Sequence, residues 1–152
     1  MDRLTRSNLG FLLAKASQRW NELLYERFRA AGFSEVRPAY GSVLVPLFEE
    51  DGLRMGELAR RARLSKQTMT TLVRLVERER LVAREPDPED ARAVRVRLTP
   101  RAREFEPIAE RVLAELEALV AGRLDDAHVR ALRAGLEEVI GVWAADHPLF
   151  EM

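Results

Sequence analysis

The side chains best suited to chemistry in this sequence are hydrogen-bonding groups gathered in one short segment. Glutamine can pair with adenine through two hydrogen bonds, lysine and arginine pair with guanine, and hydroxyl groups reach bases or phosphates. Residues 65–74 hold all of these residue types within about three helical turns. Helical spacing gathers them on polar faces, which we interpret as a surface that reads a DNA duplex. This predicted recognition face consists of Ser65, Lys66, Gln67, Thr70, Thr71 and Arg74.

The same segment has the apolar side that would hold such a helix in place. Four apolar residues recur with the i, i+3, i+4, i+7 spacing of one helical face, namely Met69, Leu72, Val73 and Val76. Serine is favoured at helix N-caps, so we expect a helix from Ser65 to about Glu79. Most surface helices are amphipathic, so the polar face taken alone could be an ordinary solvent face.

The elements around this helix indicate a winged helix-turn-helix. A short helix is predicted at residues 55–62, and a three-residue turn joins it to the recognition helix. Beyond the recognition helix the apolar period changes from 3.6 to 2, which predicts strands at residues 81–84 and 94–98. The loop at 85–93 contains two prolines and four acidic residues, so we expect a projecting, partly stiffened hairpin tip.

Long helices are predicted on both sides of this unit. They are expected at residues 7–31, 38–49, 100–121 and 125–143. Pro46 should kink the second of these helices or end its regular part, and Gly32 and Gly122 should end the first and the third. Asp125 is the expected N-cap of the last. The predicted fold is mainly α with a small β-hairpin wing, in the order α-α-α-α-β-β-α-α.

The charge of the chain is balanced in total but unevenly distributed. The 152 residues contain 25 basic and 25 acidic side chains. Residues 54–103 hold 14 of the basic and 7 of the acidic ones, whereas the remaining residues hold 11 and 18. This division is typical of a protein with one anion-binding face on a neutral or acidic body.

Composition excludes several classes of protein and disfavours others. The chain has no cysteine, which excludes disulfides, thiolate metal sites and a cysteine nucleophile. The two histidines, His128 and His147, are too isolated for a metal site, so we expect no metal and no cofactor. G-x-S-x-G, P-loop and G-x-G-x-x-G motifs are missing, which disfavours an enzyme. Without a long apolar run or a signal sequence, we expect a cytoplasmic protein with no membrane partner.

Two stretches of this sequence resemble a known family. One is M-G-E-L-A-R-R-A-R-L-S-K-Q-T-M-T-T-L-V, from Met55, and the other is L-V-A-R-E-P-D-P-E-D-A-R-A-V-R-V-R-L-T, from Leu81. Both resemble the multiple-antibiotic-resistance-regulator (MarR) family of bacterial transcription factors, whose element order agrees with the one predicted here. The most specific match is the wing pattern P-D-P-x-D-x-R followed by V-x-L-T, supplied by Pro86, Asp87, Pro88, Asp90, Arg92, Val96, Leu98 and Thr99.

The resemblance implies a homodimeric transcriptional regulator, a ligand-responsive repressor that binds a pseudo-palindromic operator in double-stranded DNA. It places the recognition face in the major groove and Arg92 in the minor groove, with Asp90 orienting the wing. We assign Arg95, on the second wing strand, to the same DNA-binding surface. It also implies that residues 1–36 and 100–152 form a dimerisation region and that residues 37–99 form the DNA-binding region of one intertwined domain.

Three residues depart from the family pattern. Arg63 in the turn and Arg80 after the recognition helix stand where the family often has glycine, and both positions are expected to need left-handed backbone. Thr71 stands where many members carry arginine.

A small aromatic or anionic effector could bind near the family's effector pocket. The candidate residues are Trp20, Arg37 and Tyr40, because two aromatic rings beside a guanidinium suit an aromatic anion. Trp20 could equally pack in the core or at the dimer interface. Two functions of other classes remain open, a winged-helix module that binds only proteins and a small helical enzyme.

Overall fold

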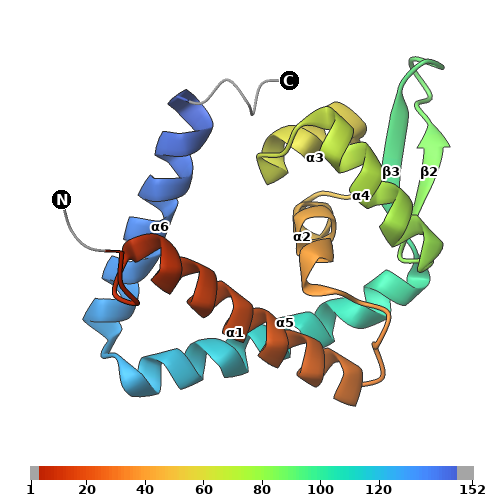
Figure 1. Cartoon of the computed structure of the whole chain (residues 1–152). Helices are drawn as coiled ribbons and strands as arrows, with labels where there is room; N and C mark the ends of the chain where they lie inside the picture. The colour runs from red at the N-terminus through yellow and green to blue at the C-terminus, as the bar shows by residue number, and fades with distance from the viewer. Residues whose placement is uncertain (1–3, 147–152) are drawn as a thin grey trace.

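The computed structural model describes residues 4–146, which form a mainly helical chain with a small antiparallel sheet (Figure 1). Its helices are α1 (Leu9–Ala30), α2 (Gly41–Glu49), α3 (Met55–Ala62), α4 (Lys66–Arg78), α5 (Pro100–Arg123) and α6 (Asp126–Asp146), and a 3-10 turn (Pro38–Tyr40) precedes α2. Its strands are β1 (Leu53–Arg54), β2 (Val82–Pro86) and β3 (Val94–Leu98), in the sheet order β1-β3-β2. The predicted winged helix-turn-helix between flanking helices is confirmed.

Short polar side chains fix where several helices begin. The Ser65 hydroxyl accepts a hydrogen bond from the backbone N–H of Thr68 at 3.1 Å, which confirms the predicted N-cap of α4. The Asp125 carboxylate accepts from the N–H of His128 at 2.8 Å, as expected for the start of α6. Asn8 and Thr99 cap α1 and α5 in the same way. Each cap satisfies an N–H group that has no partner inside its helix.

α2 ends at Glu49, as predicted, and the buried Pro46 lies inside the helix without ending it. Two other local features differ from the prediction. Gly122 does not end α5, which runs to Arg123 and stops at Leu124, a residue in extended conformation. The wing has a third strand, β1, in which Leu53 pairs with Val96 of β3.

A single hydrophobic core joins the winged helix to the flanking helices. At its centre Phe105 of α5 packs edge-to-face on Phe28 of α1, with ring centroids 4.8 Å apart, and contacts Phe33 at 5.3 Å. Met69, Val73 and Val76 were predicted as the apolar side of the recognition helix, and they are fully buried. Leu72 of the same stripe is partly buried against the core. The orientation of α4 is therefore fixed by packing against the body of the protein.

The part of the molecule formed by α1, α5 and α6 has an apolar surface that no other element of the described chain covers. α1 lies across α5, and α6 turns back at the far end of α5 (Figure 1). Large apolar side chains on these helices, and in the turn between α5 and α6, are exposed to solvent, namely Leu9, Phe11, Leu12, Leu119, Leu124, Leu132, Leu136 and Ile140. We refer to these eight residues as the apolar end face. None of the described helices is both long and apolar enough to cross a membrane.

Candidate nucleic-acid interface

The α4 helix turns its polar side outward, as the sequence predicted. Lys66, Gln67, Thr71 and Arg74 are exposed, and Ser65 and Thr70 are half-buried. The buried stripe on the opposite side holds this helix against the core, so the outward face is fixed relative to the fold.

The hydroxyl groups and the longer side chains of this face differ in what they can donate. The Thr70 hydroxyl donates to the carbonyl oxygen of Lys66 at 2.8 Å, and the Thr71 hydroxyl donates to that of Gln67 at 3.2 Å. Their hydrogens are therefore used inside the helix, which leaves oxygen lone pairs and methyl groups facing outward. Within residues 4–146 the side chains of Lys66, Gln67 and Arg74 have no hydrogen-bond partner. The donors available to a ligand are thus an amine, an amide and a guanidinium.

The positive charge without a carboxylate partner is concentrated on α4 and at its two ends. Most of the other arginines in residues 54–103 are ion-paired, for example Arg84 with Glu77 and Arg103 with Asp51. In the part of the chain that the structure describes, five cationic side chains of residues 54–103 form no ion pair, namely Arg63, Lys66, Arg74, Arg78 and Arg80. The excess charge seen in the sequence thus lies on the recognition helix and its two adjoining turns.

The backbone at both ends of α4 is left-handed, as predicted from the two departures from the family pattern. Arg63 has φ 56° and Arg80 has φ 60°, and no other non-glycine residue in the described chain has positive φ. Main-chain hydrogen bonds close both turns, including Leu64 N–H to Ala59 O at 3.0 Å and Leu81 N–H to Val76 O at 3.2 Å. This conformation costs a residue with a Cβ atom roughly 1–2 kcal/mol.

The wing is a hairpin whose tip carries Arg92 away from the body. β2 and β3 pair from Val82 opposite Leu98 up to Pro86 opposite Val94. The Arg92 side chain beyond this ladder is 93% exposed. The Asp90 carboxylate accepts hydrogen bonds from the backbone N–H of Arg92 at 3.0 Å and from its Nε at 3.4 Å. Asp90 therefore orients Arg92 locally.

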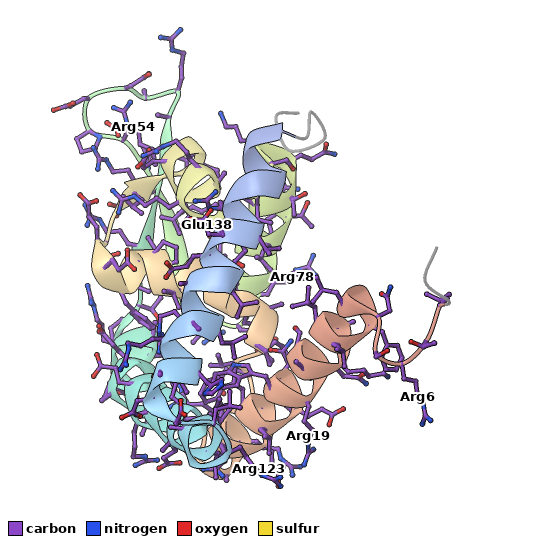
Figure 2. The ribbon with its side chains drawn as sticks, turned by 90° about the vertical axis from the view of Figure 1, so that its left-hand side faces the viewer. Arg6, Arg19, Arg54, Arg78, Arg123 and Glu138 are labelled. Carbon is purple, nitrogen blue, oxygen red and sulfur yellow. The ribbon has the colours of Figure 1, made fainter. Side chains whose placement is uncertain are left out.

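The buried carboxylate of Asp87 anchors the wing. This structural role was not predicted from the sequence. Asp87 has a fully buried side chain, and its Oδ2 accepts from Arg54 Nε at 2.7 Å and from Arg95 Nε at 2.8 Å. Its Oδ1 accepts from the N–H groups of Glu89 and Asp90. The hydrogen bond from Arg54, then those from the backbone, hold the pKa of Asp87 well below its ordinary range. Arg54 lies beside the wing, so the carboxylate links β1 to the wing loop (Figure 2).

This anchor also defines the place of Arg95. Its Nη1 donates to the carbonyl oxygen of Gly52 at 2.9 Å, in addition to the bond to Asp87. Arg95 is thus tied to the base of the wing, and its side chain is 30% exposed. The sequence signal for this anchor was the proline-aspartate-proline run at 86–88. That run does not indicate which arginines bind the carboxylate, because they come from two other strands.

The structure does not bring the three candidate effector residues together in a described cavity. The Arg37 guanidinium lies 4.7 Å from the ring centroid of Tyr25, Trp20 is half-buried against the core, and Tyr40 is buried. Burial raises the pKa of Tyr40. A shallow hollow of about 280 Å³ lies elsewhere, between α1 and α5, and is lined by Arg27, Ala30, Ala31, Arg111, Val112 and Glu115.

A comparison with protein families identifies the central part of the chain. The sequence profile of the MarR family matches residues 42–93, which run from α2 to the tip of the wing. The chain carries a MarR-family winged helix. No curated protein sequence matches the chain at a significant level.

Solved structures extend the likeness beyond the profile match. A probable transcriptional regulator from Pseudomonas aeruginosa is 24% identical, with a TM-score of 0.76 over 90% of this chain and 99% of that one. The PcaV regulator from Streptomyces coelicolor, solved with its natural ligand, is 20% identical, with a TM-score of 0.75 over 91% and 96%. The repressor CouR, solved on a 23-mer DNA duplex, is 22% identical, with a TM-score of 0.74 over 91% and 99%. At these identities the likeness shows a MarR-type fold along nearly the whole chain.

Proposed function

We propose that this MarR-family protein is a sequence-specific, DNA-binding transcriptional regulator that acts in the cytoplasm as a homodimeric repressor. The observation that carries the proposal is the set of outward donors on α4, where Lys66, Gln67 and Arg74 project from a packed helix without partners in the described chain. A helix of this kind fits the major groove and presents its first residues to base edges. Arg92 on the wing tip suits the narrow, negative minor groove.

The likeness to CouR supports this proposal, because that repressor was solved on a DNA duplex with the same arrangement of elements. In the proposed complex Ser65, Thr70 and Thr71 accept hydrogen bonds from the bases or contact thymine methyl groups. The three longer side chains, Lys66, Gln67 and Arg74, donate hydrogen bonds. Arg95 acts with Asp87 to hold the wing, so its contribution to DNA binding passes through the position of the wing that carries Arg92.

The apolar end face supports a homodimer. Its exposed leucines, isoleucine and phenylalanine lie on α1, α5 and α6 and in the turn between the last two, and so many exposed large apolar side chains on a small protein mark an interface. We assign residues 1–36 and 100–152 to the dimerisation region and residues 37–99 to the DNA-binding region. A two-fold dimer then requires a pseudo-palindromic operator with half-sites about one helical turn apart.

Selection of binding sequences from a pool of random duplexes tests the proposed function. We expect recovery of a two-fold symmetric sequence that the purified protein retards at moderate salt. If the protein bound no duplex, a winged helix used only for protein contacts would replace the proposal. Recovery of asymmetric or unrelated sequences would contradict recognition by a symmetric dimer.

Charges placed on the apolar end face should separate the dimer. The double substitution Leu132→Glu and Leu136→Glu puts two carboxylates on the exposed apolar stripe of α6, and burying them at an interface carries a large desolvation cost. Light scattering at sub-micromolar concentration should give about twice 17.4 kDa for the wild type and about 17.4 kDa for the variant. Ala134→Glu, on the opposite side of α6, is the matched control and should remain dimeric. A monomeric wild type, or an unaffected double variant, would contradict the assignment.

A small aromatic acid or phenol is the proposed effector, with Trp20, Arg37 and Tyr40 as its candidate contacts. The two recognition helices of the dimer can adopt a spacing that fits DNA or one that does not. A ligand changes the balance between them only as far as it binds one spacing more tightly than the other. Because the chain has two tryptophans, Trp143→Phe leaves Trp20 as the single reporter. We expect one such compound to change Trp20 fluorescence and to bind at least tenfold more weakly when operator DNA is present. Equal affinity with and without DNA for every compound would contradict an effector of this kind.

A further inference from the structure

We propose that Arg63 is a phosphate anchor that holds the start of the recognition helix on the DNA backbone. The proposal rests on the proposed DNA-binding function and adds to it a residue outside the predicted recognition face. Arg63 forms the turn between α3 and α4 and has left-handed backbone at φ 56°.

The fold does not require an arginine side chain at this position. The turn is closed by main-chain hydrogen bonds, Arg63 N–H to Arg60 O at 3.2 Å and Leu64 N–H to Ala59 O at 3.0 Å, which glycine would make equally well. The Arg63 side chain is exposed and, within residues 4–146, forms no hydrogen bond or ion pair. Glycine would adopt the same backbone without strain. The chain thus keeps a strained residue whose guanidinium is unused by the described structure.

The neighbouring arginines of this turn are already occupied. Arg60 and Arg61 both form ion pairs with Glu57, and Arg61 also pairs with Glu50. These contacts lower the pKa of Glu57 to about 2, which keeps the carboxylate ionised and the pairs intact at neutral pH. Arg63 is therefore the cation of the α3–α4 turn that remains available to an external anion.

The location of Arg63 matches the backbone of a groove-bound duplex. It lies three residues before Lys66, so their Cα atoms are at most about 10 Å apart. A helix whose first residues face base edges has its preceding turn beside the groove wall, where the phosphates lie. The planar guanidinium matches a phosphate through two parallel hydrogen bonds.

Arg80 provides an internal comparison with the same backbone and a different location. It also has left-handed φ, 60°, and its side chain is also exposed and unpaired in the described chain. However, it follows the 13-residue helix α4, which places it about 20 Å along the axis from Lys66. α4 ends beside the base of the wing, and Arg78 at that end lies far below the wing loop (Figures 1 and 2). A duplex that contacts Lys66 and Arg92 would not reach Arg80.

The decisive experiment compares Arg63→Gly with Arg80→Gly in the full-length protein. Both substitutions relieve the same backbone strain, so each should leave the Tm unchanged or raise it by a few degrees. Arg63→Gly alone should weaken binding to both a random duplex and the selected operator. The log–log salt slope should fall by about 0.9 per subunit, or roughly 2 per dimer. The ratio of wild-type to variant affinity should then fall by about 12-fold as the salt concentration is raised from 50 to 200 mM.

Further variants separate this inference from the proposed function. Arg63→Lys keeps the charge and should keep most of the salt slope, while Arg92→Ala serves as an independent DNA-contact variant. If the wild type binds DNA and Arg92→Ala weakens it, but Arg63→Gly and Arg80→Gly are both silent, the anchor is refuted and the function stands. Equal losses from both glycine variants would also refute the anchor, since they would indicate a general effect of charge or fold. A wild type that binds no duplex would refute the function itself.

Discussion

Asp87→Asn should lower the Tm of the protein by roughly 5–10 °C, which is the largest stability effect we expect from one polar substitution. The Asp87 carboxylate is fully buried and accepts hydrogen bonds from Arg54 and Arg95 as well as from two backbone N–H groups. Asparagine preserves the shape but removes the negative charge and replaces an acceptor oxygen with a donor. Two guanidinium groups then face each other without the carboxylate that joins them. Thermal unfolding at pH 7 measures the effect.

The pH dependence of the same variant tests the cause. The pKa of Asp87 is lowered from its ordinary value of 3.8. A group with a depressed pKa in the folded state contributes its full stabilisation above its unfolded pKa and loses it as the pH falls through the folded pKa. The Tm difference between wild type and Asp87→Asn should thus be constant from pH 5 to 7 and should narrow below about pH 3.8.

Asp90→Asn is the matched control for this prediction. The Asp90 carboxylate accepts only from Arg92 in the described structure, on an exposed loop, so its loss should change the Tm by no more than about 2 °C. Two results would show that Asp87 does not stabilise the wing through its charge. One is an equal loss of Tm for the two variants, and the other is a Tm difference between wild type and Asp87→Asn that does not depend on pH.

The parts of the fold that depend on local signals were predictable from the sequence. The bounds of α3 and β3 agree with the prediction to the residue, because the spacing of the apolar residues marks each element. The left-handed backbone at Arg63 and Arg80 was also predictable, since those positions interrupt a pattern in which glycine is usual. In each case the responsible interaction spans only a few residues along the chain.

The parts that depend on distant partners were not predictable. β1 has two residues, and its pairing of Leu53 with Val96 joins segments more than forty residues apart. The Asp87 anchor likewise needs Arg54 and Arg95 from separate strands, and nothing in the order of residues indicates which arginines will meet a given carboxylate. Arg95 was therefore assigned to the DNA surface, although its donors are largely committed to the base of the wing.

For the candidate site, the sequence predicted which face is polar but not which of its groups are available. Thr70 and Thr71 carry hydroxyls of the right type, yet the helix itself takes their hydrogens. Threonine hydroxyls in helices commonly bond to the carbonyl four residues earlier. This competition leaves Lys66, Gln67 and Arg74 as the donors of the face, and directional recognition should depend chiefly on them.

Gln67→Ala and Arg92→Ala should therefore impair DNA binding in different ways. Gln67 lies at the start of α4, where a side chain meets base edges, so its loss should cost about 1–3 kcal/mol at one symmetric pair of operator positions. Binding to random duplexes should change little. The exposed Arg92 side chain would enter the minor groove, which distinguishes little beyond A·T from G·C and attracts arginine through its negative potential. Arg92→Ala should weaken specific and random duplexes alike and lower the salt slope by roughly 2 per dimer.

Titrations of both variants against selected and random duplexes, at several salt concentrations, distinguish these two roles. Thr71→Ala is the comparison on the recognition face. Its hydroxyl hydrogen is already bonded to the carbonyl oxygen of Gln67, so truncation removes no donor and should cost less affinity than Gln67→Ala. An unchanged affinity and slope for Arg92→Ala would show that the wing does not contact DNA in this protein. If Gln67→Ala and Lys66→Ala left every operator position unchanged as well, α4 would not be the element that reads the groove, and the donors on its outward face would need another ligand.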